Sequence, residues 1–146
     1  MKIAFGADHA GFEYKRQIME WMRENDYQVL DFGTFSDESV DYPDYAFPAA
    51  ESVAANIADF GVIICGSGIG MAIIANKVTG IRAANCCNPE MARLAREHNN
   101  ANVITFGARL IDIDTAKQMI TEFVEGEFQG GRHMIRVEKI HSLTGW

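Results

Sequence analysis

Five short apolar runs recur along the chain, and segments of helix length separate them. The runs are Lys2–Gly6, Tyr27–Phe32, Gly61–Cys65, Ile81–Asn85 and Asn102–Phe106. Continuous apolar runs of this length are typical of strands that are buried on both faces. Their alternation with amphipathic segments indicates repeated βα units around a mainly parallel sheet. The pattern therefore predicts an α/β fold in three layers with a five-stranded sheet.

The segments between the runs carry apolar residues at helical spacing. In Gly11–Arg23, for example, Ile18 and Met22 share one helix face. Pro43 and Pro89 suit the first turn of a helix. The chain has no internal repeat or linker-like stretch, so we expect one domain over residues 1–146. The predicted helices are Gly11–Arg23, Asp44–Ala55, Ile69–Lys77, Pro89–His98 and Asp112–Val124, followed by a helical tail, Arg132–Trp146, that docks elsewhere.

Charge and hydropathy argue against two classes of partner. A formal net charge of -7 leaves no surplus of Lys and Arg to coat nucleic acid or an anionic lipid surface. No apolar run approaches the roughly 18–20 residues of a membrane span, and the N-terminus lacks the pattern of a secretory leader. We therefore expect a cytoplasmic protein, although a small anion in a local basic pocket is compatible with the charge.

The chain has three cysteines, Cys65, Cys86 and Cys87. Their number is odd and no CxxC pair occurs, so we expect reduced thiols. Cys86 and Cys87 continue the fourth predicted strand without a glycine loop or a basic neighbour, and we assign both to packing.

Cys65 instead opens a glycine-rich loop, Cys65-Gly66-Ser67-Gly68-Ile69-Gly70, after the third predicted strand. Ligands of parallel sheets bind beyond the carboxyl ends of the strands. Successive glycines before a helix let backbone N–H groups converge on an anion and stabilise an oxyanion. The same surroundings favour a thiolate, which can abstract a carbon-bound proton.

The loop also has other interpretations. A cysteine that ends a buried strand is often only a small apolar side chain, but the glycines that follow favour a functional role. The loop is neither GxGxxG nor a Gly-Lys-Ser/Thr phosphate loop, and Ser67 lacks the GxSxG frame of hydrolases. A cysteine phosphatase would carry arginine six positions after its thiolate, where this chain has Met71.

Three more regions carry candidate side chains. Asp8 and His9 follow the first strand, where Asp8 as a helix N-cap is an equally good interpretation. His98, in a predicted loop after the fourth helix, can exchange a proton near neutral pH, although a surface histidine is the commoner explanation. Arg132 and Arg136 would share a helix face that can hold a phosphate, but spacing alone favours an ordinary solvated basic face.

Together these stretches resemble the ribose-5-phosphate isomerase B family, which also contains the galactose-6-phosphate isomerase subunits. The resemblance covers essentially the whole chain. It implies a Rossmann-like three-layer αβα sandwich that works on a small sugar phosphate with neither metal nor organic cofactor. The matching segments are residues 3–12, 41–46, 65–70, 75–77, 98–99, 106–109 and 130–136.

The resemblance also implies the catalytic roles. Cys65 would move a proton between C1 and C2 of the open-chain sugar, and Ser67 and the loop backbone would hold the enediolate. His98 would open the sugar ring, with Asp8 at the sugar hydroxyls. Some relatives carry a catalytic glutamate at the position of Met71, so the cysteine-type subgroup is implied.

The implied binding residues come from several parts of the chain. The family assembles its site between two subunits, so we expect a homodimer or homotetramer in which the tail serves a neighbour. The residues implied to bind substrate are Asp8, His9, Gly66, Ser67, Gly68, Ile69, Gly70, Asn99, Arg109, Arg132 and Arg136, of which His9 and the three arginines would surround the phosphate.

Three functions follow as hypotheses. The first is isomerisation of ribose 5-phosphate to ribulose 5-phosphate. The second is the same chemistry on allose 6-phosphate, galactose 6-phosphate or a tetrose phosphate, because small differences in pocket length change the sugar without changing the base. The third is a sugar-phosphate-binding module without activity, which the intact catalytic positions disfavour.

Overall fold

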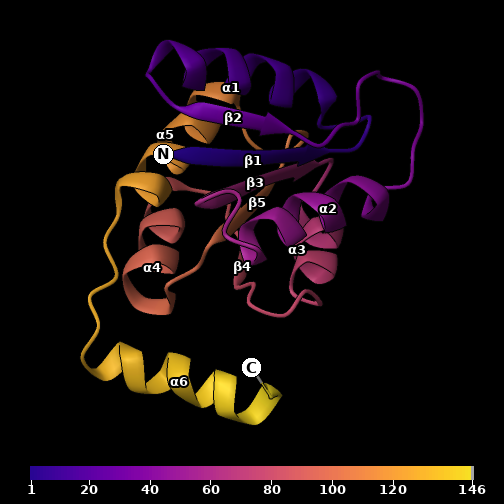
Figure 1. The fold of residues 1–146 in the computed structure, drawn as a ribbon. Coiled ribbons are helices and arrows are strands. Elements are labelled where there is room, and N and C mark those ends of the chain that lie inside the picture. The colour runs from indigo at the N-terminus through magenta and orange to yellow at the C-terminus, as the bar shows by residue number, and fades with distance from the viewer. Residues whose placement is uncertain (146) are drawn as a thin grey trace.

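Five strands form one sheet in the order β2-β1-β3-β5-β4, and every neighbouring pair is parallel. The computed structural model describes residues 1–145. The predicted α/β sheet is confirmed and is wholly parallel rather than mainly so (Figure 1). The strands are β1 (Lys2–Ala7), β2 (Gln28–Asp31), β3 (Phe60–Cys65), β4 (Ala83–Asn85) and β5 (Val103–Gly107).

Helices cover both faces of the sheet and complete the three predicted layers. The helices are α1 (Phe12–Glu24), α2 (Pro43–Ala54), α3 (Ile69–Ala75), α4 (Pro89–Asn99), α5 (Ile113–Glu125) and α6 (Arg132–Thr144). Helices α1, α4 and α5 pack into one apolar cluster with the sheet, and α2 and α3 pack into a second cluster on the opposite face. Pro43 and Pro89 begin helices as the sequence predicts.

Helix α3 and strand β4 are shorter than expected, for a local reason. Helix α3 stops at Ala75 because the side chain of Asn76 bonds both backbone groups of Ala83, at 2.8 and 2.9 Å. These bonds fix the start of β4 at Ala83, so the predicted strand loses Ile81 and Arg82. Ile81 is nevertheless buried, which explains why it reads as part of the apolar run.

The switch in strand order falls between β1 and β3. The chain leaves β1 for α1 on one face and leaves β3 for α3 on the other. Loops that diverge in this way open a crevice at the carboxyl edge of a parallel sheet, where ligands of such folds bind.

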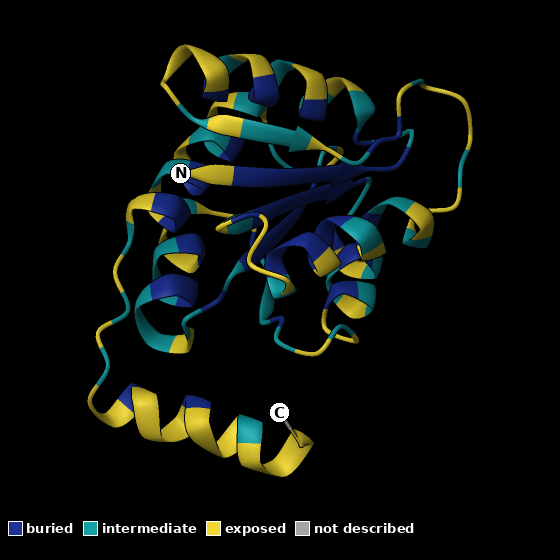
Figure 2. Ribbon diagram, in the orientation of Figure 1, coloured by how far each residue is buried: buried dark blue, intermediate teal, exposed yellow. Residues whose placement is uncertain are grey.

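Helix α6 is the predicted tail, and it lies apart from the three layers (Figure 1). Only His133 and Val137 of this helix are buried, and Figure 2 shows most of its surface exposed. Its exposed side chains include Ile135 and Leu143, at 68% and 77% exposure. Across residues 1–145, no helix has the length and apolar character needed to cross a bilayer.

Candidate active site

The glycine loop connects the end of β3 to the start of α3. Cys65, the last residue of β3, is only 6% exposed. The backbone N–H of Gly68 donates to its Sγ at 3.0 Å. An N–H directed at the sulfur stabilises negative charge there, so the geometry suits a thiolate base.

Close contacts and a positive φ require glycine at position 68 of this loop, and Gly70 lies close to a side chain. Gly68 has φ +79°, and a Cβ on it would lie 2.2 Å from Oδ1 of Asn85 and 2.6 Å from the carbonyl carbon of Phe106. A Cβ on Gly70 would lie 2.8 Å from Cζ of Tyr42. The loop therefore packs tightly against Asn85 and Phe106 at Gly68, and it faces the ring of Tyr42 at Gly70.

Asp8 lies next to Cys65 across the sheet edge. Its backbone N–H donates to the carbonyl of Ile64 at 3.2 Å. Its Oδ1 accepts from the N–H groups of Ala10 and Gly11, at 2.9 and 3.1 Å, which forms a turn ahead of α1. The interpretation of Asp8 as an N-cap is wrong, because Gly11 holds that position. The carboxylate is buried, 8% exposed, and lines the cavity described below.

The loop between β2 and α2 is tied to this edge. The backbone N–H of Val40 donates to Nδ1 of His9 at 3.3 Å. The buried Lys15 donates to the carbonyl of Thr34 at 2.8 Å and pairs with Asp31. His9 is half-buried beside Asp8 but does not line the cavity itself.

Arg109 completes the carboxyl edge from the loop after β5. Its N–H donates to the carbonyl of Gly66 at 3.2 Å, and its guanidinium lies over that glycine. A cavity of about 460 Å³ opens between these loops. Its lining residues are Asp8, Tyr42, Cys65, Gly66, Ser67, Gly70, Arg109 and Leu110.

Two lining residues escaped the sequence analysis. Tyr42 lies in the segment 41–46, whose match to the family was a usable signal. Leu110, 68% exposed, carried no signal, since an apolar residue after a strand has many ordinary explanations.

His98 and Asn99 lie at the opposite edge of the sheet, meaning the end at which the strands begin, because the chain enters β5 at Val103 soon after Asn99. Helix α4 starts from the carboxyl edge at Pro89 and runs for 11 residues, which is about 16 Å. His98 is therefore in the last turn of α4, which agrees with the predicted helix Pro89–His98 and not with a loop over residues 96–100. Its ring stacks on that of His133. Asn99 borders a second cavity of about 490 Å³, between α6 and the loop after α3.

Arg132 and Arg136 project from α6 at this opposite edge, and both are exposed. The predicted site residues thus form two groups within one chain. The carboxyl-edge group is Asp8, His9, Cys65, Gly66, Ser67, Gly68, Ile69, Gly70 and Arg109. The tail group is His98, Asn99, Arg132 and Arg136.

The other cysteines differ from Cys65 and from each other. Cys86 is buried as predicted, and burial, with a smaller contribution from Cys87, raises its pKa to about 12. The assignment of Cys87 to packing is wrong, because β4 ends at Asn85 and leaves Cys87 exposed before α4. Within residues 1–145, no cluster of three His, Cys, Asp or Glu side chains is arranged to hold a metal ion.

The sequence pattern of the Ribose/Galactose Isomerase family matches residues 3–140. The chain belongs to this family. Ribose-5-phosphate isomerase B of Escherichia coli K12 is 44% identical over 142 residues, which cover 97% of this chain and 95% of that protein.

Solved structures of this family superpose closely. Ribose-5-phosphate isomerase B of Clostridium thermocellum has a TM-score of 0.97 at 48% identity, over 99% of this chain and 98% of that one. The enzyme of Mycoplasma genitalium with bound ribulose-5-phosphate has a TM-score of 0.94 at 36% identity, over 99% and 96%. As a member of this family, the chain is an aldose–ketose isomerase.

Proposed function

We propose that the chain isomerises ribose 5-phosphate to ribulose 5-phosphate, with Cys65 as the proton-moving base. The observation that carries the proposal is the sulfur of Cys65, held 3.0 Å from the Gly68 N–H at the end of β3 and opening onto the cavity. A base and an anion-stabilising loop at one point are what an enediolate intermediate requires.

The chemistry has two steps in which the two groups of residues act. His98 donates a proton to the ring oxygen while the anomeric hydroxyl loses its own, so the bond between C1 and the ring oxygen breaks and C1 becomes an aldehyde. Cys65 then removes the proton on C2, and Ser67 and the loop N–H groups stabilise the charge that develops on the C1 oxygen. The C1 oxygen gains a proton as the C2 hydroxyl loses one, and Cys65 returns its proton to C1, which leaves the carbonyl at C2. Asp8 contacts the sugar hydroxyls.

Phosphate binding uses both edges of the sheet. Arg109 extends over the glycine loop, with His9 near it. Arg132 and Arg136 are exposed on α6, one helical turn apart, and can hold a phosphate together. Asn99 contacts the sugar.

Because the two groups lie at opposite edges of one chain, the working site needs a second copy. We propose a homodimer, alone or paired into a tetramer, in which the tail of one subunit completes the carboxyl edge of the other. Apolar side chains exposed on α3 and on α6 support such an interface. They are Ile69, Ile73, Met134, Ile135, Ile140 and Leu143. We further propose that the enzyme is one domain and works in the cytoplasm, where its three free thiols stay reduced.

A substrate comparison tests the function. Catalytic efficiency is measured without added metal on ribose 5-phosphate, allose 6-phosphate, galactose 6-phosphate and erythrose 4-phosphate. We expect ribose 5-phosphate to be the best substrate by at least about tenfold. A higher efficiency on another sugar would contradict ribose 5-phosphate as the substrate and would assign the same chemistry to that sugar. No turnover of any of the four sugars would contradict the isomerase proposal itself.

A further inference from the structure

Two histidine rings from distant parts of the chain lie face to face. The centroids of His98 and His133 are 4.2 Å apart and the ring planes differ by 6°. His98 is in the last turn of α4 and His133 in the first turn of α6. His133 is buried, 8% exposed, whereas His98 keeps part of its surface open. One face of the His98 ring is therefore covered, while part of the residue stays exposed.

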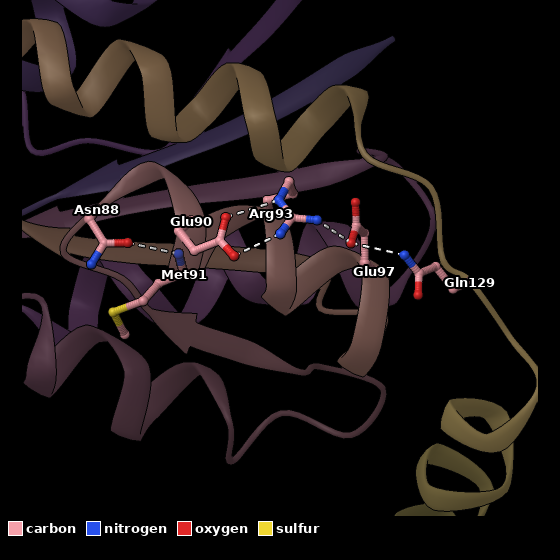
Figure 3. Close-up of polar contacts among 6 residues, drawn as sticks. All are labelled: Asn88, Glu90, Met91, Arg93, Glu97 and Gln129. Atoms are coloured by element: carbon pink, nitrogen blue, oxygen red, sulfur yellow. Dashed lines mark hydrogen bonds and ion pairs between the residues drawn. The ribbon is translucent and has the colours of Figure 1, made fainter.

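A polar network fixes α6 at this place. The backbone N–H of Gln129 donates to the carbonyl of Glu97 at 3.0 Å, and its side chain donates to the Glu97 carboxylate at 2.9 Å. Arg93 bonds the same carboxylate at 2.6 Å and also pairs with Glu90 at 2.7 Å (Figure 3). Glu97 immediately precedes His98, so the segment leading to α6 is anchored one residue from the stacked ring.

The surroundings of His133 favour the neutral form of its ring. Burial lowers the pKa of His133, with further lowering by His98 across the stack and by Arg132 and Arg136 on its own helix. A neutral ring can remain against His98 when His98 gains a proton, whereas two charged rings would repel each other.

We propose that His133 is a positioning residue for the ring-opening step, holding the His98 imidazole in a fixed plane through the stack. The inference rests on the proposed role of His98 as the acid that opens the sugar. Proton transfer from an imidazole runs in the plane of the ring, so rotation of the ring misdirects the donating nitrogen. Covering one face restricts that rotation and leaves the edge for the sugar.

Two substitutions separate the stack from the imidazole itself. His133→Phe keeps a flat ring without a titrating group, and His133→Leu removes the flat ring. Rates are measured on ribose 5-phosphate, which must open, and on erythrose 4-phosphate, which cannot close into a ring. We expect His133→Leu to lower kcat on ribose 5-phosphate about tenfold, with erythrose 4-phosphate within about twofold and His133→Phe close to the unsubstituted enzyme.

A measurement on the ring itself keeps the test independent of activity. The NMR order parameter of the His98 side chain should fall in His133→Leu and be retained in His133→Phe. Equal rate losses on both sugars, equal damage by Phe and Leu, or an unchanged order parameter in His133→Leu would overturn the inference.

His98→Asn, assayed on the same two sugars, separates this inference from the proposed function. If His98→Asn also impairs both sugars equally, the ring-opening role of His98 itself is wrong. If it impairs only ribose 5-phosphate while His133→Leu impairs neither, the role of His98 stands and that of His133 fails.

Discussion

Cys65 and Cys86 are both buried thiols, but the sulfur of Cys65 faces a hydrogen-bond donor and that of Cys86 faces an acceptor. The sulfur of Cys65 accepts the N–H of Gly68 at 3.0 Å, whereas that of Cys86 faces the carbonyl oxygen of Ala84 at 3.7 Å, to which only a protonated thiol can donate. Burial disfavours a charge on the sulfur of Cys86. Cys65 differs in having an N–H donor at its sulfur, so a single hydrogen bond separates a candidate base from an inert core residue.

The close packing of the glycine loop leads to a stability prediction. Gly68→Ala places a Cβ against Asn85 and the backbone of Phe106 at positive φ. We expect the free energy of unfolding to fall by about 2–4 kcal/mol, measured by urea denaturation. Gly130→Ala is the matched control, because Gly130 has φ +63° but nothing within 4 Å, and it should cost only about 1 kcal/mol. Equal losses would show that close contact does not restrict the loop.

At the scale of elements, helix α4 connects the two groups of functional residues and also separates them. Its first turn is at the carboxyl edge, where the Asn88 side chain accepts from the N–H of Met91 at 2.9 Å. Its last turn carries His98 to the other edge. The helix is thus the reason why one chain does not place His98 beside Cys65.

The docking of α6 on α4 should weaken in acid. The pKa of His133 is lowered in the folded protein, so the unfolded chain binds its proton more readily. The stability that neutral His133 provides is complete above the ordinary histidine pKa of about 6.5 and is lost as the pH falls toward the lower folded value. We expect the thermal midpoint to drop as the pH falls below about 6.5, and to drop less in His133→Phe. An equal drop in both proteins would contradict this linkage.

The elements were largely predictable from the sequence, and the contacts between distant elements were not. Apolar runs located all five strands because strands of a parallel sheet are buried on both faces. The limits of β4 depend on hydrogen bonds from Asn76, seven residues before Ala83, which periodicity does not reveal. The stack of His98 on His133 joins positions that are 35 residues apart, so no local sequence pattern predicts it.

For the whole molecule, the geometry of one chain defines what a second chain must supply. The carboxyl-edge group has a base, an oxyanion loop and one arginine, and it lacks the acid and the paired arginines that the tail group carries at the other edge. A symmetric dimer places the same two groups together twice, because each contact in such an interface recurs in reverse. The family resemblance named the residues and implied a shared site, and the fold shows that one chain keeps the two groups apart.

Complementation between two inactive variants tests this account most directly. Cys65→Ala and His98→Asn alone should each lack turnover of ribose 5-phosphate, since every site is defective. When the two are refolded together in equal amounts, half of the dimers are mixed and each mixed dimer has one intact site, so activity should return to about a quarter of the unsubstituted level. Cys65→Ala refolded with Ser67→Ala is the control and should stay inactive, because both changes affect the carboxyl-edge group. No recovery in the first mixture, or equal recovery in both, would contradict a site that uses Cys65 of one subunit and His98 of the other.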